Sequence, residues 1–174
     1  MVLGVDGWPI ITCPSGFEVY KAATRKLSLC APAGWRGGIA QEFSGGKDEP
    51  EGYIQFLIVW THPDNPYHFV GLQIVSRESR GTRDTWQLKC ATPVADQLLR
   101  IPGERCFGDT TTPNGVPLSG GVTWGLEIFA ETPEYWVILD AAGTQQTSEA
   151  IAAAREDARL VGARAAANGL ARLQ

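Results

Sequence analysis

The segment from Gly121 to Asn168 constrains the fold more than any other part of the chain. Apolar and polar residues alternate over residues 122–130, which is typical of a β-strand with one buried face. Residues 131–134 (ETPE) then predict a tight turn, and residues 135–139 (YWVIL) are apolar on both faces, which predicts a strand inside a sheet. A long helix is expected from about Ser148, which we interpret as its N-cap. The buried stripe of this helix repeats at helical spacing and is mostly alanine: Ile151, Ala154, Ala158, Val161 and Ala165.

The first half of the chain predicts pairs of antiparallel strands. Residues 17–20 and 26–31 are expected to pair around a polar turn. Residues 53–61 (YIQFLIVWT) are apolar on both faces, so we expect a central strand, with residues 69–76 as its neighbour.

A short helix is predicted in the middle of the chain. Thr92 is a suitable N-cap, and Pro93 would occupy the first helical position. Val94, Leu98 and Ile101 would then share one face of this helix.

These elements together predict an α+β fold. We expect an antiparallel sheet of about six or seven strands, with the short helix and the long C-terminal helix packed on it as in an α/β/α sandwich. A chain of 174 residues can bury a substantial core and is short for two domains, so residues 1–174 are interpreted as a single domain.

Charge and hydropathy exclude some partners. The net charge of −4 argues against nucleic acid, because phosphate binding requires a basic surface. No apolar run is long enough to predict a transmembrane segment. The first eight residues lack the pattern of a signal peptide. Either the protein is intracellular, or the chain starts after a signal peptide that has been removed. The sequence does not specify an oligomeric state.

Four cysteines, Cys13, Cys30, Cys90 and Cys106, contain no closely spaced pair of the kind that binds zinc. Three disulfide connectivities are possible, and we favour Cys13–Cys30 with Cys90–Cys106. Such bonds predict an extracytoplasmic protein, either periplasmic or secreted. The alternative is four buried free thiols in a cytosolic protein.

The run Leu27–Trp35 (LSLCAPAGW) resembles the early strand of the Mog1/PsbP-like sandwich family, in which a strand ends in a Pro-x-Gly-Trp turn. The closing strand, turn, strand and helix are also similar in order to that fold. The resemblance implies a non-catalytic accessory or assembly protein, or a lipoprotein, outside the cytoplasm. The four cysteines are not part of the family's pattern, and no lipidation cysteine is present. The resemblance assigns no site residues.

The two histidines of the chain, His62 and His68, lie in one proline-containing connection. Together with Asp64 they could bind zinc or copper if the segment folded back on itself. The alternative is a solvated connection whose prolines determine its shape. Serine catalysis is less favoured, because Ser119 lacks the first glycine of a GxSxG turn.

Two sets of residues are candidates for binding. Arg77, Arg80 and Arg83 could hold an anion, although nearby acidic residues also fit a solvated turn. Trp8 and Trp35 lie in segments rich in glycine and proline, where they would either anchor a partner or cap the open end of the sandwich.

Our first functional hypothesis is therefore a non-enzymatic extracytoplasmic protein that binds a protein partner or assists assembly, with no cofactor and no assigned catalytic residue. A small hydrolase that uses the His62–His68 segment, or a cleft near residues 108–121, is the second hypothesis. A carrier with an apolar pocket between sheet and helix is the third.

Overall fold

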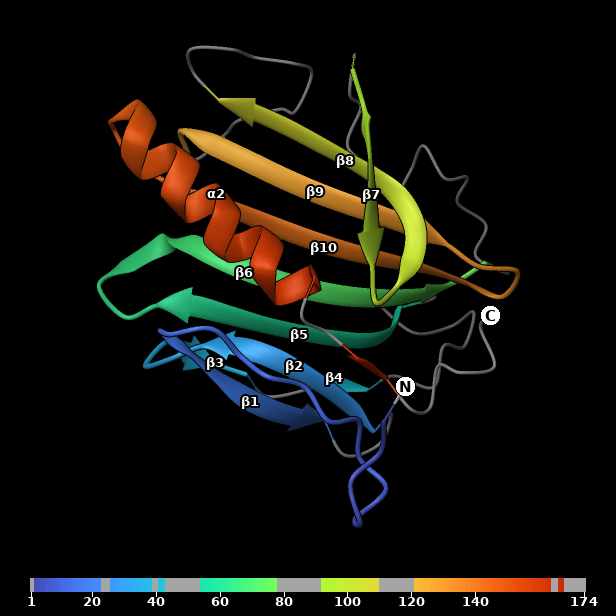
Figure 1. The fold of residues 1–174 in the computed structure, drawn as a ribbon. Coiled ribbons are helices and arrows are strands. Elements are labelled where there is room, and N and C mark those ends of the chain that lie inside the picture. Colours follow the sequence, from blue (N-terminus) through green and yellow to red (C-terminus); the bar gives the residue numbers. More distant parts are fainter. Residues whose placement is uncertain are drawn as a thin grey trace.

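The computed structural model describes residues 2–22, 26–38, 41–42, 54–77, 92–109, 121–163 and 166–167. Within these ranges the chain forms two antiparallel sheets and one helix (Figure 1). The elements are β1 (Phe17–Ala22), β2 (Leu27–Pro32), β3 (Arg36–Gly37), β4 (Gln41–Glu42), β5 (Ile54–His62), β6 (Asn65–Ser76), β7 (Val94–Leu98), β8 (Ile101–Asp109), β9 (Trp124–Glu131), β10 (Tyr135–Gly143), α2 (Ser148–Ala163) and β11 (Ala166–Ala167).

The larger sheet has the strand order β3-β5-β6-β10-β9-β8-β7, and β4 also pairs with β5. Strand β10 lies between β6 and β9, so the apolar run at residues 135–139 is inside the sheet, as predicted. Strands β5 and β6 pair as neighbours, also as predicted, and the chain turns between them at His62 and Asn65. Residues 44–52, 85–89 and 110–120 lie outside the described residues.

The smaller sheet has the strand order β1-β2-β11, with β2 in the middle. All six residues of β2 are buried. The ring of Tyr20 on β1 meets the ring of Trp60 on β5 edge to face, with 5.6 Å between the centroids. The predicted first strand pair is therefore present, but it forms a second sheet that packs on the first.

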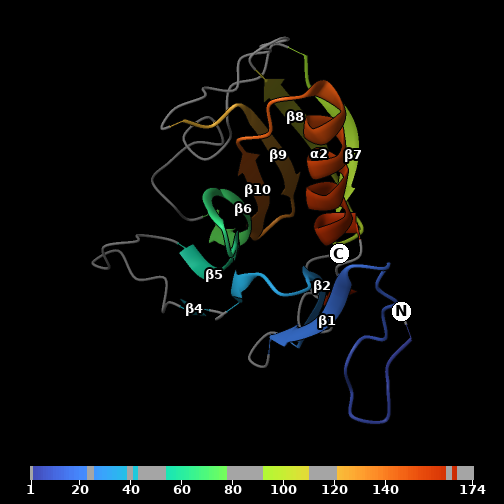
Figure 2. The ribbon, with the colours of Figure 1, turned by 90° about the vertical axis from the view of Figure 1, so that its left-hand side faces the viewer.

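Helix α2 packs across one face of the larger sheet, next to the edge strand β7 (Figures 1 and 2). Its predicted buried residues Ile151, Ala154 and Ala158 are buried in one core cluster with side chains from both sheets. Trp124 and Leu126 of β9 belong to this cluster and supply the bulk that the small alanines leave room for.

The helix predicted from Thr92 to Ile101 is wrong. Residues 94–98 form strand β7, which pairs with β8 through a two-residue turn at Leu99 and Arg100. Apolar residues four apart share one side of a strand as well as one face of a helix, so Val94 and Leu98 did not discriminate between the two. Pairing with β8 therefore decided the conformation.

The C-terminal helix is also shorter than expected. It ends at Ala163, and Ala166–Ala167 then pair with β2. Its N-cap is Thr147 rather than Ser148, because the Thr147 hydroxyl accepts the backbone N–H of Ala150 at 3.2 Å. The side chains of Val161 and Ala165 lie outside the described residues.

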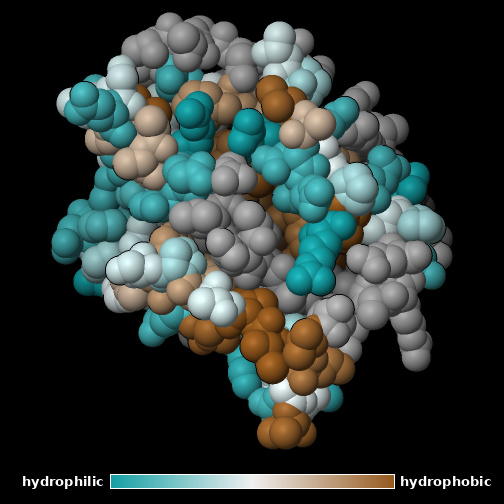
Figure 3. All heavy atoms as spheres, in the orientation of Figure 1, coloured by the Kyte–Doolittle hydropathy of each residue, from teal (hydrophilic) through white to brown (hydrophobic). Residues whose placement is uncertain are grey.

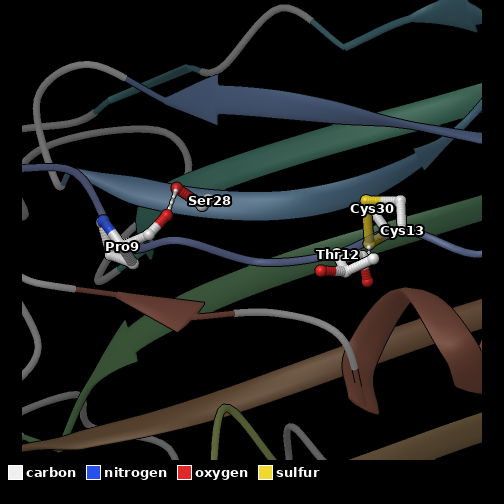
Figure 4. Close-up of a disulfide and its surroundings, with 5 residues drawn as sticks. All are labelled: Pro9, Thr12, Cys13, Ser28 and Cys30. Carbon is white, nitrogen blue, oxygen red and sulfur yellow. Dashed lines mark hydrogen bonds between the residues drawn. A yellow bond between two sulfur atoms is a disulfide. The ribbon is translucent and has the colours of Figure 1, made fainter. Parts of the chain in front are cut away.

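A disulfide joins Cys13 to Cys30, as predicted, and ties the N-terminal segment to β2 (Figure 4). Near it, the Ser28 hydroxyl donates to the Pro9 carbonyl at 2.9 Å. Cys106 is also disulfide-bonded, and its predicted partner Cys90 lies outside the described residues. Disulfides of this kind are typical of proteins in oxidising compartments, in agreement with an extracytoplasmic protein.

Candidate functional site

A pocket of about 140 Å³ opens at one end of the sandwich, between the smaller sheet, β6 and α2. Its walls come from four parts of the chain that are distant in sequence. The lining residues are Ser15, Gly16, Phe17, Pro32, Trp35, His68, Val70, Ala154, Asp157 and Ala158. Two predicted site residues, Trp35 and His68, therefore meet at this pocket.

His68 is buried in strand β6. Burial, with a smaller contribution from the neighbouring His62, lowers the pKa of His68 to about 4. The His68 imidazole is therefore neutral at neutral pH.

A chain of hydrogen bonds determines which nitrogen of His68 carries the proton. The indole N–H of Trp124 can only donate, and it donates to Oε1 of Gln145. The other end of the Gln145 amide, Nε2, then donates to His68 Nδ1 at 3.0 Å. The His68 proton must therefore sit on Nε2. A Cβ atom at Gly143 would collide with both Gln145 and Trp124, so glycine is required beside this chain.

The two histidines stack on each other, with parallel rings whose centroids are 5.6 Å apart. The Nδ1 atom of His62 accepts the backbone N–H of Asp64 at 3.2 Å. Within the described residues, no three His, Cys, Asp or Glu side chains are grouped so that they could hold a metal ion. Among the described residues, Gln145 is the one side chain that is hydrogen-bonded to the His68 imidazole. No serine or cysteine nucleophile is therefore paired with His68 in the described part of the chain.

Trp35 is half-buried, and its ring meets the ring of His68 edge to face at 4.6 Å between centroids. It forms one wall of the pocket. Trp35 thus contributes to an aromatic cluster at the open end of the sandwich.

Arg77 contacts the turn between β9 and β10. Its guanidinium pairs with Glu131 at 2.7 Å and donates to the Thr132 carbonyl at 2.8 Å. These contacts occupy the side chain that was predicted to hold an anion. The other two predicted arginines, Arg80 and Arg83, lie outside the described residues.

Residues 2–10, which we call the N-terminal finger, project from the smaller sheet (Figure 1). The finger is a small hairpin in which Gly4 N–H donates to the Trp8 carbonyl at 2.8 Å and Ile10 N–H to the Val2 carbonyl at 3.0 Å. Trp8 is half-buried, and the Lys21 ammonium lies 5.4 Å from its ring centroid. Apolar side chains gather on the finger and stay exposed (Figure 3): Val2, Leu3, Val5 and Ile10.

A second polar cluster lies on the face of the larger sheet opposite α2. Glu127 on β9 is directly across from Asp140 on β10, and Gln73 donates to the Asp140 carboxylate at 2.9 Å. Glu127 is buried. Burial raises the pKa of Asp140 to about 6, although hydrogen bonds from Gln73 and Glu127 oppose the shift.

The sequence did not identify Gln145, Asp157 or the Glu127–Asp140 pair as site residues. A signal existed for the pair, because both carboxyl groups interrupt otherwise apolar strands. No local signal existed for Gln145, which lies in a polar connection and meets His68 only in the folded chain.

The fold is an α+β sandwich, with a smaller sheet and a helix packed on a larger antiparallel sheet. It resembles the solution structure of cyanobacterial PsbP (CyanoP) from Synechocystis sp. PCC 6803, with a TM-score of 0.50 and 10% sequence identity over 88% of this chain and 94% of that chain. The resemblance to PsbP suggested by the sequence is therefore confirmed at the level of the fold.

No family model and no curated protein matches the sequence. The described part of the chain contains no helix with the length and apolar character needed to cross a bilayer.

Proposed function

We propose that this protein is a non-enzymatic, extracytoplasmic binding protein that docks onto a protein partner through its N-terminal finger. The observation that carries the proposal is the exposed apolar surface of the finger. The side chains of Val2 and Ile10 are 70% and 61% exposed, and Val5 at the tip is fully exposed. Exposed apolar clusters of this kind are typical of interaction surfaces.

The surface continues onto β1. Val19 and Lys21 share one side of this strand, and Lys21 contacts both Trp8 and Asp6. Val19 is 47% exposed, so it extends the apolar surface at the base of the finger.

The finger has a rigid base. The Cys13–Cys30 disulfide holds the segment that follows the finger against β2, and the hydrogen bond from Ser28 holds Pro9 of the finger against the same strand. A surface that is already ordered loses less conformational entropy when it binds, which favours affinity.

A charged pair favours a protein partner over a lipid bilayer. Asp6 lies beside Val5 and pairs with Lys21 at 2.8 Å, and Lys21 and the Trp8 N–H lower the pKa of Asp6. Insertion of the tip into hydrocarbon would desolvate this ionised carboxylate, which is costly. An apolar groove with a polar rim accommodates both the valine and the ion pair.

The test places a photo-activatable amino acid at Val5 and, as a control, at Val94. Val94 is 51% exposed and lies on β7, at the far edge of the larger sheet. Irradiation in cells of the source organism should give a discrete adduct with another protein from position 5 and none from position 94. The partner, once identified and purified, should bind Val5→Asp at least tenfold more weakly than wild type, with Val94→Asp unchanged.

Three outcomes would overturn this proposal. An adduct at twice the mass of the chain would mean self-association. Flotation with liposomes that is lost in Val5→Asp would mean membrane binding. Equal affinity of the purified partner for Val5→Asp and wild type would show that the finger is not the docking surface.

A further inference from the structure

The pocket beside Trp35 has the composition of a site for a small organic cation. Aromatic rings from Phe17 and Trp35 form part of its wall. Aromatic faces attract cations through the negative potential of the π-system. Val70, Ala154 and Ala158 provide an apolar surface for the hydrocarbon part of a ligand.

Among the described lining residues, Asp157 alone carries a charge at neutral pH, since His68 is neutral. Asp157 is exposed, and desolvation by partial burial and the charge of Glu156 raise the pKa of its carboxyl group. Asp157 has neither a salt bridge nor a hydrogen bond from its side chain within the described residues. Arg155, two positions earlier on α2, lies instead over the ring of Phe107 at 4.4 Å.

The size of the pocket limits the ligand. A volume of about 140 Å³ is close to the roughly 150 Å³ of an engineered apolar cavity that binds benzene, a molecule of six heavy atoms. Butylammonium, with five heavy atoms, is of this size. The side chain of a lysine presents the same chemical group.

We propose that this pocket binds an alkylammonium group, with the ammonium against Asp157 and the aromatic rings and the alkyl chain against Val70, Ala154 and Ala158. This site is separate from the N-terminal finger and does not depend on the function proposed for it. The ammonium group supplies the positive charge that Asp157 lacks among the described residues.

The test follows the NMR signal of the Trp35 indole N–H during titration with three probes of equal length: n-butylammonium, n-butanol and butyrate. Butylammonium should give a saturable shift. Butanol should bind at least tenfold more weakly, and butyrate should give no saturable shift. Equal affinity for butanol would show that the pocket selects apolar ligands, and the absence of any butylammonium binding would also overturn the proposal.

Variants separate the role of Asp157 from a general charge effect. Asp157→Asn should weaken butylammonium binding at least tenfold. Glu149→Gln removes the same charge from an exposed position of α2 that does not line the pocket, and it should bind like wild type. Equal losses in both variants would overturn the site, and so would unchanged binding in Asp157→Asn.

A final comparison identifies the source of the ammonium group. The tripeptide Gly-Lys-Gly, with blocked termini, is titrated alongside butylammonium. Tighter binding of the tripeptide supports the site with a protein lysine as ligand, and tighter binding of butylammonium supports it with a free amine.

Discussion

At the scale of single residues, the buried carboxyl groups on the face of the larger sheet opposite α2 affect how the stability of the protein depends on pH. Asp140 and Glu127 face each other across β9 and β10. Desolvation by burial raises the pKa of Asp140 to about 6 and outweighs the hydrogen bond from Glu127, which lowers the pKa of this carboxyl group.

We predict that Asp140 makes the folded protein less stable as the pH rises from about 4 to about 6. The folded state holds a proton on Asp140 in this range, whereas the unfolded chain, with a pKa near 3.8, has released it. A shift of about two pKa units corresponds to at most about 3 kcal/mol. Asp140→Asn should therefore be more stable than wild type at pH 7 and about equal to it at pH 4, as measured by urea unfolding.

His68 has the opposite effect, because its lowered pKa means that the unfolded chain binds the extra proton between about pH 4 and pH 6.5. Because His68 is present in both proteins, its contribution cancels when the free energy of unfolding of wild type is subtracted from that of Asp140→Asn. Asp64→Asn makes the same substitution at an exposed position and serves as the control. A difference that is independent of pH for Asp140→Asn would contradict the assignment.

At the scale of elements, the β7–β8 hairpin shows how strand pairing overrides local signals. Leu99 and Arg100 adopt positive φ angles of 54° and 67°. This region is unfavourable for residues with a Cβ atom, by roughly 1–2 kcal/mol each. Pairing of β7 and β8, and burial of Leu98 and Ile101, offset that cost.

We expect Arg100→Gly to stabilise the protein by up to about 1 kcal/mol, because glycine adopts positive φ without steric strain. For a chain of this size, the gain corresponds to a melting temperature about 2–4 °C higher. Arg100→Ala removes the same side chain but keeps the Cβ atom, so it should show no gain. Equal stabilisation by alanine and glycine would attribute the effect to the lost arginine side chain.

At the scale of the whole molecule, long-range connections place the N-terminal finger and the pocket. The Cys13–Cys30 bond attaches a segment without regular strands to the fully buried β2. The rings of Trp35 and His68 meet at the pocket, which Pro32 at the end of β2 also lines. The disulfide therefore affects both the global stability and the position of the proposed docking surface.

We predict that Cys13→Ala/Cys30→Ala lowers the free energy of unfolding by about 3 kcal/mol, since the bond closes a loop of 17 residues. Urea unfolding under non-reducing conditions measures this loss. Amide hydrogen exchange at Gly4 and Ile10 should accelerate more than exchange in the central strands β6 and β10. Equal acceleration everywhere would show that the bond stabilises the fold without ordering the finger.

The sequence by itself determined the conformation of the strands with unambiguous periodicity. The apolar runs in β5 and β10 predicted their places inside the sheet, and the antiparallel pairing of β5 with β6 followed from their proximity. The Cys13–Cys30 pair was also correctly selected from the possible connectivities. Alternation and apolar runs report on local conformation and burial, which the neighbouring residues largely decide.

Only the tertiary structure decided the hairpin at residues 94–109, the end of α2 at Ala163, and the site. The spacing of Val94 and Leu98 fits two conformations, so partner strands made the choice. The proton position on His68 depends on Gln145 and Trp124, which lie 77 and 56 positions further along the chain. The absence of a cation beside Asp157 among the described residues likewise depends on which side chains fold around it. Periodicity carries no information about such contacts, because they join segments whose local patterns are independent of each other.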